Sequence, residues 1–185
     1  MIELEETAIP DVKILRPKRF GDARGYFSET FNKQALAEAG IEFDAIQDNE
    51  SLSASPGTIR GLHFQKPDAA QAKLVRVLSG SIFDVAIDLR RGSPSYGRHV
   101  GVTLSADDWR QLLVPKGFAH GFCTLTDGVE VLYKVTDYYA PDNDVGLAWD
   151  DPDLAIAWPV AIGDAVLSDK DRKLPRLADL ASPFD

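Results

Sequence analysis

The chain has 185 residues and a formal net charge of -9 at pH 7, from 29 acidic and 20 basic residues. This length fits one domain with one sizeable core, and the acidity disfavours a broad nucleic-acid footprint. No run reaches the roughly 20 apolar residues that span a bilayer, and the first residues, "MIELEETAIPDVKIL", lack the basic and apolar blocks of a secretory signal. We therefore expect no membrane span, no nucleic-acid partner and a cytoplasmic location.

Two short elements are predicted near the N-terminus. In "FGDARGYFSETF", Phe27, Glu29 and Phe31 share one face of a predicted half-buried strand that follows Arg24. A short helix is predicted over residues 32–39, because Asn32 can cap its start and a glycine follows its end.

The centre of the chain is a succession of strand patterns. The run "KLVRVLSGSIFDVAIDLR" contains two alternating segments around Gly80, which predicts a hairpin with Val85 and Ile87 on one face and Asp84, Ala86 and Asp88 on the other. Further strands are predicted at 100–104, 111–114, 119–125 and 129–137. Many short strands with turn-rich connections favour a mainly β sandwich or barrel of antiparallel type, with the jelly roll among the options. We find no repeat or linker that divides the chain. The single cysteine, Cys123, is expected to be a buried small hydrophobe.

Two histidine segments resemble an incomplete cupin metal site. In "TIRGLHFQ" the motif places His63 correctly but has Gln65 where a second histidine belongs, and "PKGFAHGF" supplies His120. Two nitrogen donors form a poor site, because transition metals normally take three or four protein donors. His63 is therefore either a histidine satisfied in the core or a general base near neutral pH, and His120 has the same two interpretations.

Strand parity links further polar residues to an interior. Lys73 alternates with Val75 and Val77, and Tyr133 alternates with valines in "VEVLYKV", so both side chains project in an apolar direction. A buried ammonium is costly unless it meets an anion. Parity also places Arg60 and His63 on opposite faces, so a shared site requires a bulge or bend at Gly61.

Several segments together resemble the dTDP-4-dehydrorhamnose 3,5-epimerase family. They are "RFGDARGYFSETF", "QDNES", "IRGLHFQ", "AQAKLVRVLSGSIFDVAIDLR", "VPKGFAHGF", "YKVTDYYAPDND" and "SDKD", in order over nearly the whole chain. The resemblance implies a cupin-like jelly-roll antiparallel barrel with a few short helices. It also implies one domain over residues 1–185, with a barrel core at about 43–140 on which N-terminal strands and a C-terminal segment pack.

The resemblance further implies a homodimer that acts on a dTDP-linked 4-keto-6-deoxyhexose without metal or organic cofactor. It assigns the catalytic base to His63, its orienting carboxylate to Asp171, the acid to Tyr133 and the group beside the keto oxygen to Lys73. The implied substrate-binding residues are Arg24, Phe27, Glu29, Gln47, Asn49, Arg60, His120, Tyr139, Asp144 and Lys170. Asp144 is shorter than the Glu that the family pattern predicts.

The expected activity is 3,5-epimerisation of dTDP-4-dehydro-6-deoxy-D-glucose, which gives dTDP-4-dehydro-L-rhamnose for dTDP-L-rhamnose biosynthesis. The 4-keto group makes the protons on carbons 3 and 5 acidic, so a base, a cation near the oxygen and an acid on the opposite face are needed. The alternatives are a single-carbon epimerase of a related pathway, a metal-dependent cupin enzyme that uses His63 and His120, and a sugar-nucleotide binding module without chemistry.

Overall fold

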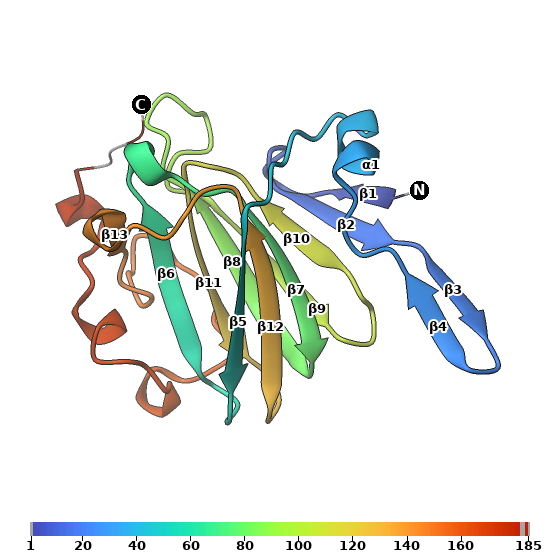
Figure 1. Cartoon of the computed structure of the whole chain (residues 1–185). Helices are drawn as coiled ribbons and strands as arrows, with labels where there is room; N and C mark the ends of the chain where they lie inside the picture. The colour runs from blue at the N-terminus through green and yellow to red at the C-terminus, as the bar shows by residue number, and fades with distance from the viewer. Residues whose placement is uncertain (1, 182–183, 185) are drawn as a thin grey trace.

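The computed structural model describes residues 2–181 and 184, which form two facing antiparallel sheets, one short helix and a separate hairpin (Figure 1). The six-stranded sheet has the order β1 (Ile2–Glu6), β2 (Lys13–Pro17), β10 (Gln111–Val114), β7 (Lys73–Ser79), β12 (Val129–Val135) and β5 (Gln47–Ser53). The five-stranded sheet has the order β13 (Asp144–Gly146), β6 (Ile59–Gln65), β11 (Phe118–Thr124), β8 (Ser81–Asp88) and β9 (His99–Ser105). The predicted mainly β, jelly-roll class is confirmed.

The main core lies between the two sheets. Val75 and Val131 of the six-stranded sheet pack in one cluster with Ile82, Ala86 and other residues of the five-stranded sheet. The predicted strands at 100–104, 111–114, 119–125 and 129–137 correspond to β9, β10, β11 and β12 within two residues at each end. Alternation was informative because each strand turns one face toward this core.

The outer face of the five-stranded sheet is covered by the C-terminal segment. Val85 and Ile87 of β8 pack with Leu62, Leu154 and Leu177 in a second cluster, and the segment after β13 runs along this side of the barrel (Figure 1). This segment contains the short 3-10 helices η3 (Ile162–Asp164), η4 (Asp171–Lys173) and η5 (Leu177–Asp179). Strand β8 is therefore buried on both faces. Cys123, which is fully buried as expected, packs below the same segment with Trp149.

The hairpin predicted around Gly80 is wrong. Strand β7 pairs with β10 and β12, whereas β8 pairs with β11 and β9, so the chain crosses from one sheet to the other at Gly80. Gly80 has φ +73°, and a Cβ there would lie 2.4 Å from Thr126 Oγ1. The glycine therefore permits a tight corner against a neighbouring loop, and turn residues alone do not distinguish this corner from a hairpin.

The N-terminal region contributes a helix and a projecting hairpin. Helix α1 (Lys33–Glu38) begins after Asn32, whose side chain accepts a hydrogen bond from the Ala35 amide, as predicted. Among the described residues, strands β3 (Arg19–Asp22) and β4 (Gly25–Ser28) pair only with each other, and they extend away from the barrel (Figure 1). The prediction of a half-buried strand here is wrong, because β4 is exposed and the Phe27 side chain is 69% accessible.

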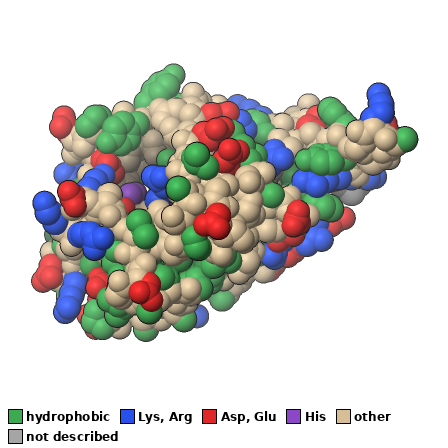
Figure 2. All heavy atoms as spheres, turned by 90° about the horizontal axis from the view of Figure 1, so that it is seen from below, with side chains coloured by type: hydrophobic (Ala, Val, Ile, Leu, Met, Phe, Trp, Pro, Cys, Tyr) green, Lys and Arg blue, Asp and Glu red, His purple; other side chains and the backbone are tan. Residues whose placement is uncertain are grey.

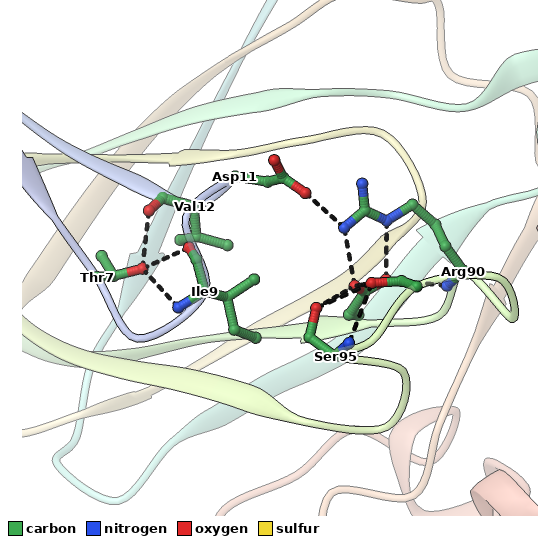
Figure 3. Close-up of polar contacts among 8 residues, drawn as sticks. Thr7, Ile9, Asp11, Val12, Arg90 and Ser95 are labelled. Carbon is green, nitrogen blue, oxygen red and sulfur yellow. Dashed lines mark hydrogen bonds and ion pairs between the residues drawn. The ribbon is translucent and has the colours of Figure 1, made fainter.

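A polar network anchors the turn between β1 and β2 to the end of β8 (Figure 3). Arg90 donates hydrogen bonds to Asp88 at 2.9 Å and 2.8 Å and to Asp11 at 2.7 Å, and Ser93 and Ser95 also donate to Asp88. Burial alone would raise the pKa of Asp88, but these donors hold it well below its usual value. Asp88 is thus a stabilised structural carboxylate.

Two remaining 3-10 turns, η1 (Pro67–Ala69) and η2 (Pro141–Asn143), lie in the connections that follow β6 and β12. Within residues 2–181 and 184, no helix has the length and apolar character needed to cross a membrane.

Candidate active site

Two adjoining cavities between the sheets contain most of the predicted site residues. The larger, of about 470 Å3, and the smaller, of about 240 Å3, share His63, Lys73 and Tyr133 in their walls. Figure 2 shows a hollow on this side of the molecule in which a histidine side chain is visible, with Lys and Arg side chains around it. The larger cavity adds Arg60, His120, Lys170 and Asp171. The smaller adds Gln47, Asn49, Tyr139 and Asp144.

A bulge at Gly61 brings Arg60 and His63 to the same cavity, as strand parity requires. His63 pairs with His120 and Arg60 pairs with Phe122, so two residues of β6 lie opposite one of β11. Gly61 has φ +137°, and a Cβ there would lie 2.5 Å from the Gly121 Cα. Only glycine fits this close approach of two backbones.

His63 is held by a buried carboxylate from the C-terminal segment. Its Nε2 lies 2.6 Å from Asp171 Oδ1, and Asp171 itself is 5% exposed. Burial alone would raise the pKa of Asp171, but hydrogen bonds from His63, the Gly61 amide and Ser168 hold it below its usual value. An ionised Asp171 favours the tautomer with the proton on Nε2, which leaves Nδ1 of His63 free to accept a proton.

Lys73 is a buried cation beside His63. Its side chain lies at the start of β7 on the same inner face as Val75 and Val77, and the residue is 8% exposed, which confirms the direction predicted from parity. Its Nζ lies 3.4 Å from the His63 carbonyl oxygen. Burial lowers the pKa of Lys73 to about 8, although the negative charges of Asp84 and Asp144 act in the opposite direction. An ammonium here would place positive charge inside the cavity at neutral pH.

Tyr133 reaches the cavities from the sheet opposite His63. It lies on β12, where Val131 and Val135 on the same face are fully buried. Burial raises the pKa of the Tyr133 phenol, so the hydroxyl keeps its proton at neutral pH. A base on one sheet and a phenol on the other can therefore address opposite faces of a flat group bound between them.

A chain of polar contacts joins the residues of the smaller cavity. The Gln47 side-chain NH2 donates to Asn49 Oδ1 at 2.8 Å. The Gln47 side-chain oxygen Oε1 accepts from the Tyr139 backbone amide at 3.2 Å. The Tyr139 hydroxyl donates to Asp144 at 3.1 Å, and Lys170 forms an ion pair with the same carboxylate. The Tyr139 ring is 55% exposed, so it is available to stack on a flat ligand group.

Arg60 and His120 complete the wall of the larger cavity. The Arg60 guanidinium donates to the Ser53 hydroxyl at 3.0 Å and to the Leu52 carbonyl at 2.9 Å. His120 is buried, and its Nε2 lies 2.7 Å from Asp84. Burial lowers the pKa of His120, while Asp84 acts in the opposite direction.

Three predicted binding residues do not line these cavities in the single chain. Arg24 lies at the tip of the β3–β4 hairpin, pairs with Asp22, and has a side chain that is 90% exposed. Phe27 is exposed on the same hairpin, and Glu29 accepts a hydrogen bond from Asn32 at 2.9 Å. Their assignment to the substrate stays a prediction.

The two cavity histidines contact different carboxylates: His63 contacts Asp171, and His120 contacts Asp84. In the part of the chain that the structure describes, no group of three or more His, Cys, Asp or Glu side chains is arranged to hold a metal ion. The residues present thus provide no ready-made three-donor site of the cupin type.

Sequence reasoning did not select several residues at the site, among them two serines and one aspartate. Ser51 and Ser168 line the larger cavity, and Asp84 contacts His120 from β8. Alternation placed Asp84 in line with Ala86 on β8, but nothing in the sequence tied it to His120. The two serines lie within the quoted segments "QDNES" and "SDKD", but nothing in these segments distinguished them as cavity residues.

Comparisons with known proteins agree on one family. The family model described as dTDP-4-dehydrorhamnose 3,5-epimerase matches residues 6–179. An Escherichia coli protein of that name is 50% identical over 175 residues, covering 94% of each chain. A crystal structure of the Bacillus anthracis protein of that name with TDP and PPi bound superposes with TM-score 0.93 at 53% identity, covering 96% of this chain and 100% of that one. The Legionella pneumophila dTDP-6-deoxy-D-glucose-3,5-epimerase, in complex with dTDP-4-keto-L-rhamnose, gives TM-score 0.92 at 43% identity, covering 97% and 95%.

Proposed function

Because the chain belongs to the dTDP-4-dehydrorhamnose 3,5-epimerase family, we propose that its cavity inverts carbons 3 and 5 of dTDP-4-dehydro-6-deoxy-D-glucose. The product, dTDP-4-dehydro-L-rhamnose, serves dTDP-L-rhamnose biosynthesis. The chain is accordingly an isomerase. The observation that carries the residue assignment is the His63–Asp171 pair at 2.6 Å in a cavity shared with Lys73 and Tyr133.

His63 acts as the base. Removal of a proton from carbon 3 or 5 breaks a C–H bond and leaves its electron pair in an enolate whose charge lies on the oxygen at carbon 4. With Nε2 bonded to Asp171, Nδ1 takes the proton, and the carboxylate favours the imidazolium that forms.

Lys73 and Tyr133 complete the reaction. The buried Lys73 ammonium stabilises the developing oxyanion. Removal of one such donor typically lowers kcat by about 10²–10³-fold. Tyr133 then donates its phenolic proton to the same carbon from the opposite face, which inverts the centre and re-forms the ketone. Once His63 has released its proton to solvent and Tyr133 has regained one, the same steps at the second carbon give the product.

The remaining residues bind the nucleotide part. Tyr139 offers an exposed ring for the thymine base, since stacking needs no particular base edge. Arg60 suits bidentate contacts to a phosphate, which lets an acidic protein hold a dianion locally. Gln47 and Asn49 form a polar wall beside Tyr139.

A homodimer would bring Arg24, Phe27 and Glu29 to the substrate. The β3–β4 hairpin pairs with no other strand in the described part of the chain, and it exposes Phe20 (53%), Tyr26 (58%) and Phe27 (69%). Exposed apolar side chains on a projecting hairpin favour burial against another chain. We propose that each hairpin reaches the cavity of a second copy and supplies Arg24 to the diphosphate. The cytoplasmic location also stays a prediction.

Mixing two inactive variants tests this arrangement. Arg24→Ala and His63→Gln are each expected to have a low kcat/KM alone. In mixed dimers the cavity with intact His63 receives Arg24 from the other chain, so an equal mixture should recover about a quarter of the wild-type activity. No recovery after unfolding and refolding the two chains together would show that Arg24 acts within its own chain or not at all. Two copies of Arg24→Ala, treated identically, provide the control.

Solvent labelling tests the reaction itself. Proton NMR of the wild-type chain with dTDP-4-dehydro-6-deoxy-D-glucose in deuterated water should show deuterium at both carbons 3 and 5 as product forms, because each inversion exchanges a carbon-bound proton. Label at one carbon would favour the single-carbon epimerase, and label at neither would refute the proposal. Treatment of the purified protein with a chelator is also expected to leave turnover unchanged. Loss of activity that added metal restores would favour the metal-dependent alternative.

A further inference from the structure

Asp84 is a carboxylate inside the apolar core. It lies on β8 between Ile82 and Ala86, both members of the cluster between the sheets, and it is 0% exposed. A buried carboxylate is costly unless partners satisfy it. Asp88 lies four residues further along β8 on the same face, and it receives hydrogen bonds from Arg90 and two serines. Asp84 has no comparable set of donors.

Only one oxygen of Asp84 has a hydrogen-bond partner. Oδ1 lies 2.7 Å from His120 Nε2, whereas Oδ2 is buried and has no partner among residues 2–181 and 184. Because burial lowers the pKa of His120, the imidazole is neutral near pH 7 and donates one hydrogen bond without neutralising the carboxylate.

Lys73 is a buried cation that lines the larger cavity together with His120, the hydrogen-bond partner of Asp84. Burial lowers its pKa to about 8, against the opposing effects of Asp84 and Asp144. Its described hydrogen bond, at 3.4 Å, goes to a backbone carbonyl and provides no counter-charge. Asp144 lies at the cavity wall and already pairs with Lys170. Asp84 lies in the core, where a charge is screened much less.

We propose that Asp84 is a positioning residue for the epimerisation, with one oxygen keeping Lys73 in the ammonium form and the other holding His120 with its proton on Nε2. The inference rests on the proposed function, because only an ammonium stabilises the enolate oxygen electrostatically. It also makes His120 Nδ1 a hydrogen-bond acceptor, suited to a hydroxyl of the sugar.

The other titratable groups around Lys73 do not replace Asp84. They are Asp144 on β13, His63 and Arg60 on β6, His120 on β11, Tyr133 on β12, Asp171 on η4, and Tyr139 and Lys170. Arg60 and Lys170 are cations and supply no negative charge. Asp171 is committed to His63, and a raised pKa keeps the Tyr133 phenol neutral. Asp84 is therefore the carboxylate that is both fully buried and incompletely bonded.

The direct test is an NMR titration of Lys73, in which the 13Cε chemical shift of labelled lysine is measured against pH. The Lys73 signal is assigned by its absence in Lys73→Arg. In the wild type the residue should titrate near pH 8. In Asp84→Asn, which keeps the side-chain shape and removes the charge, the pKa of Lys73 should fall by about one pH unit or more. Asp88→Asn is the matched control, because it removes an equally buried charge from the same strand face. It should lower thermal stability and leave the titration of Lys73 unchanged.

Activity gives a second measurement. The rate requires protonated Lys73, so kcat is present below the pKa of Lys73 and lost as pH rises through it. Asp84→Asn should shift this alkaline limb to lower pH while the acidic limb stays in place. A uniform loss of rate with an unshifted limb, or an unchanged Lys73 titration, would overturn the proposal. If Asp84→Asn does not fold, the wild-type titration still decides, because a pKa well below 7 would leave Lys73 neutral. Since the titration needs no substrate, its outcome is independent of whether the proposed function holds.

Discussion

Replacement of His63 by Gln is expected to lower kcat by about 10³-fold and to stop deuterium entry at both carbons. General-base catalysis contributes about 10²–10⁴-fold, and the glutamine amide cannot take a proton from carbon. The partner, Asp171, would keep a hydrogen-bond donor within reach, so the fold should be retained. The measurement is steady-state turnover together with proton NMR in deuterated water.

His99→Gln is the matched control for this variant. His99 lies on β9, pairs with Ile87 and lines neither cavity. It should keep wild-type exchange and turnover. A His63→Gln protein that retained activity within about tenfold of the wild type would contradict the assignment of the base, since that loss is below the range for general-base removal.

Tyr133→Phe is expected to separate proton removal from inversion. The phenylalanine ring keeps the packing beside Val131 and Val135, but the proton donor on this face is lost. His63 can still remove the carbon proton and return a deuteron to the same face. Deuterium should therefore enter substrate without inversion, while product formation falls by about 10²–10⁴-fold. The ratio of exchange rate to epimerisation rate, both read by NMR, should rise by the same factor.

Tyr138→Phe is the control for this experiment. Tyr138 is 65% exposed, follows β12 by three residues and lines neither cavity. Wild-type inversion in Tyr138→Phe would support Tyr133 as the acid. Loss of inversion in Tyr138→Phe together with normal inversion in Tyr133→Phe would reverse the assignment.

Local patterns predicted the parts of the fold that depend on neighbouring residues. Alternation oriented Lys73 and Tyr133 correctly because a strand in a two-sheet core must turn alternate side chains inward. The conflict in parity at Gly61 required a bulge, and the register shift between β6 and β11 confirms it. The cap at Asn32 was predictable because it needs only three residues.

Features set by distant packing were not predictable in this way. The corner at Gly80 depends on which strands are available in each sheet, and the exposure of β4 depends on the absence of a covering strand in the same chain. Asp84 had the residue type of a turn or surface position, and only its His120 partner, 36 residues away, gives it a place in the site. The His63–Asp171 pair was expected only from the family resemblance, and the Asp84–His120 pair came from the tertiary structure alone.

The origin of Asp171 in the C-terminal segment has a consequence for biosynthesis. His63 and its carboxylate are 108 residues apart, and every strand of both sheets precedes Asp171 in the chain. On the ribosome, the strands that form the barrel emerge before the carboxylate that orients the base. If Asp171 orients the base as proposed, a chain that has assembled only its sheets would turn over slowly until the C-terminal segment docks. On the proposed assignment, activity thus depends on docking of the C-terminal segment as well as on folding of the barrel.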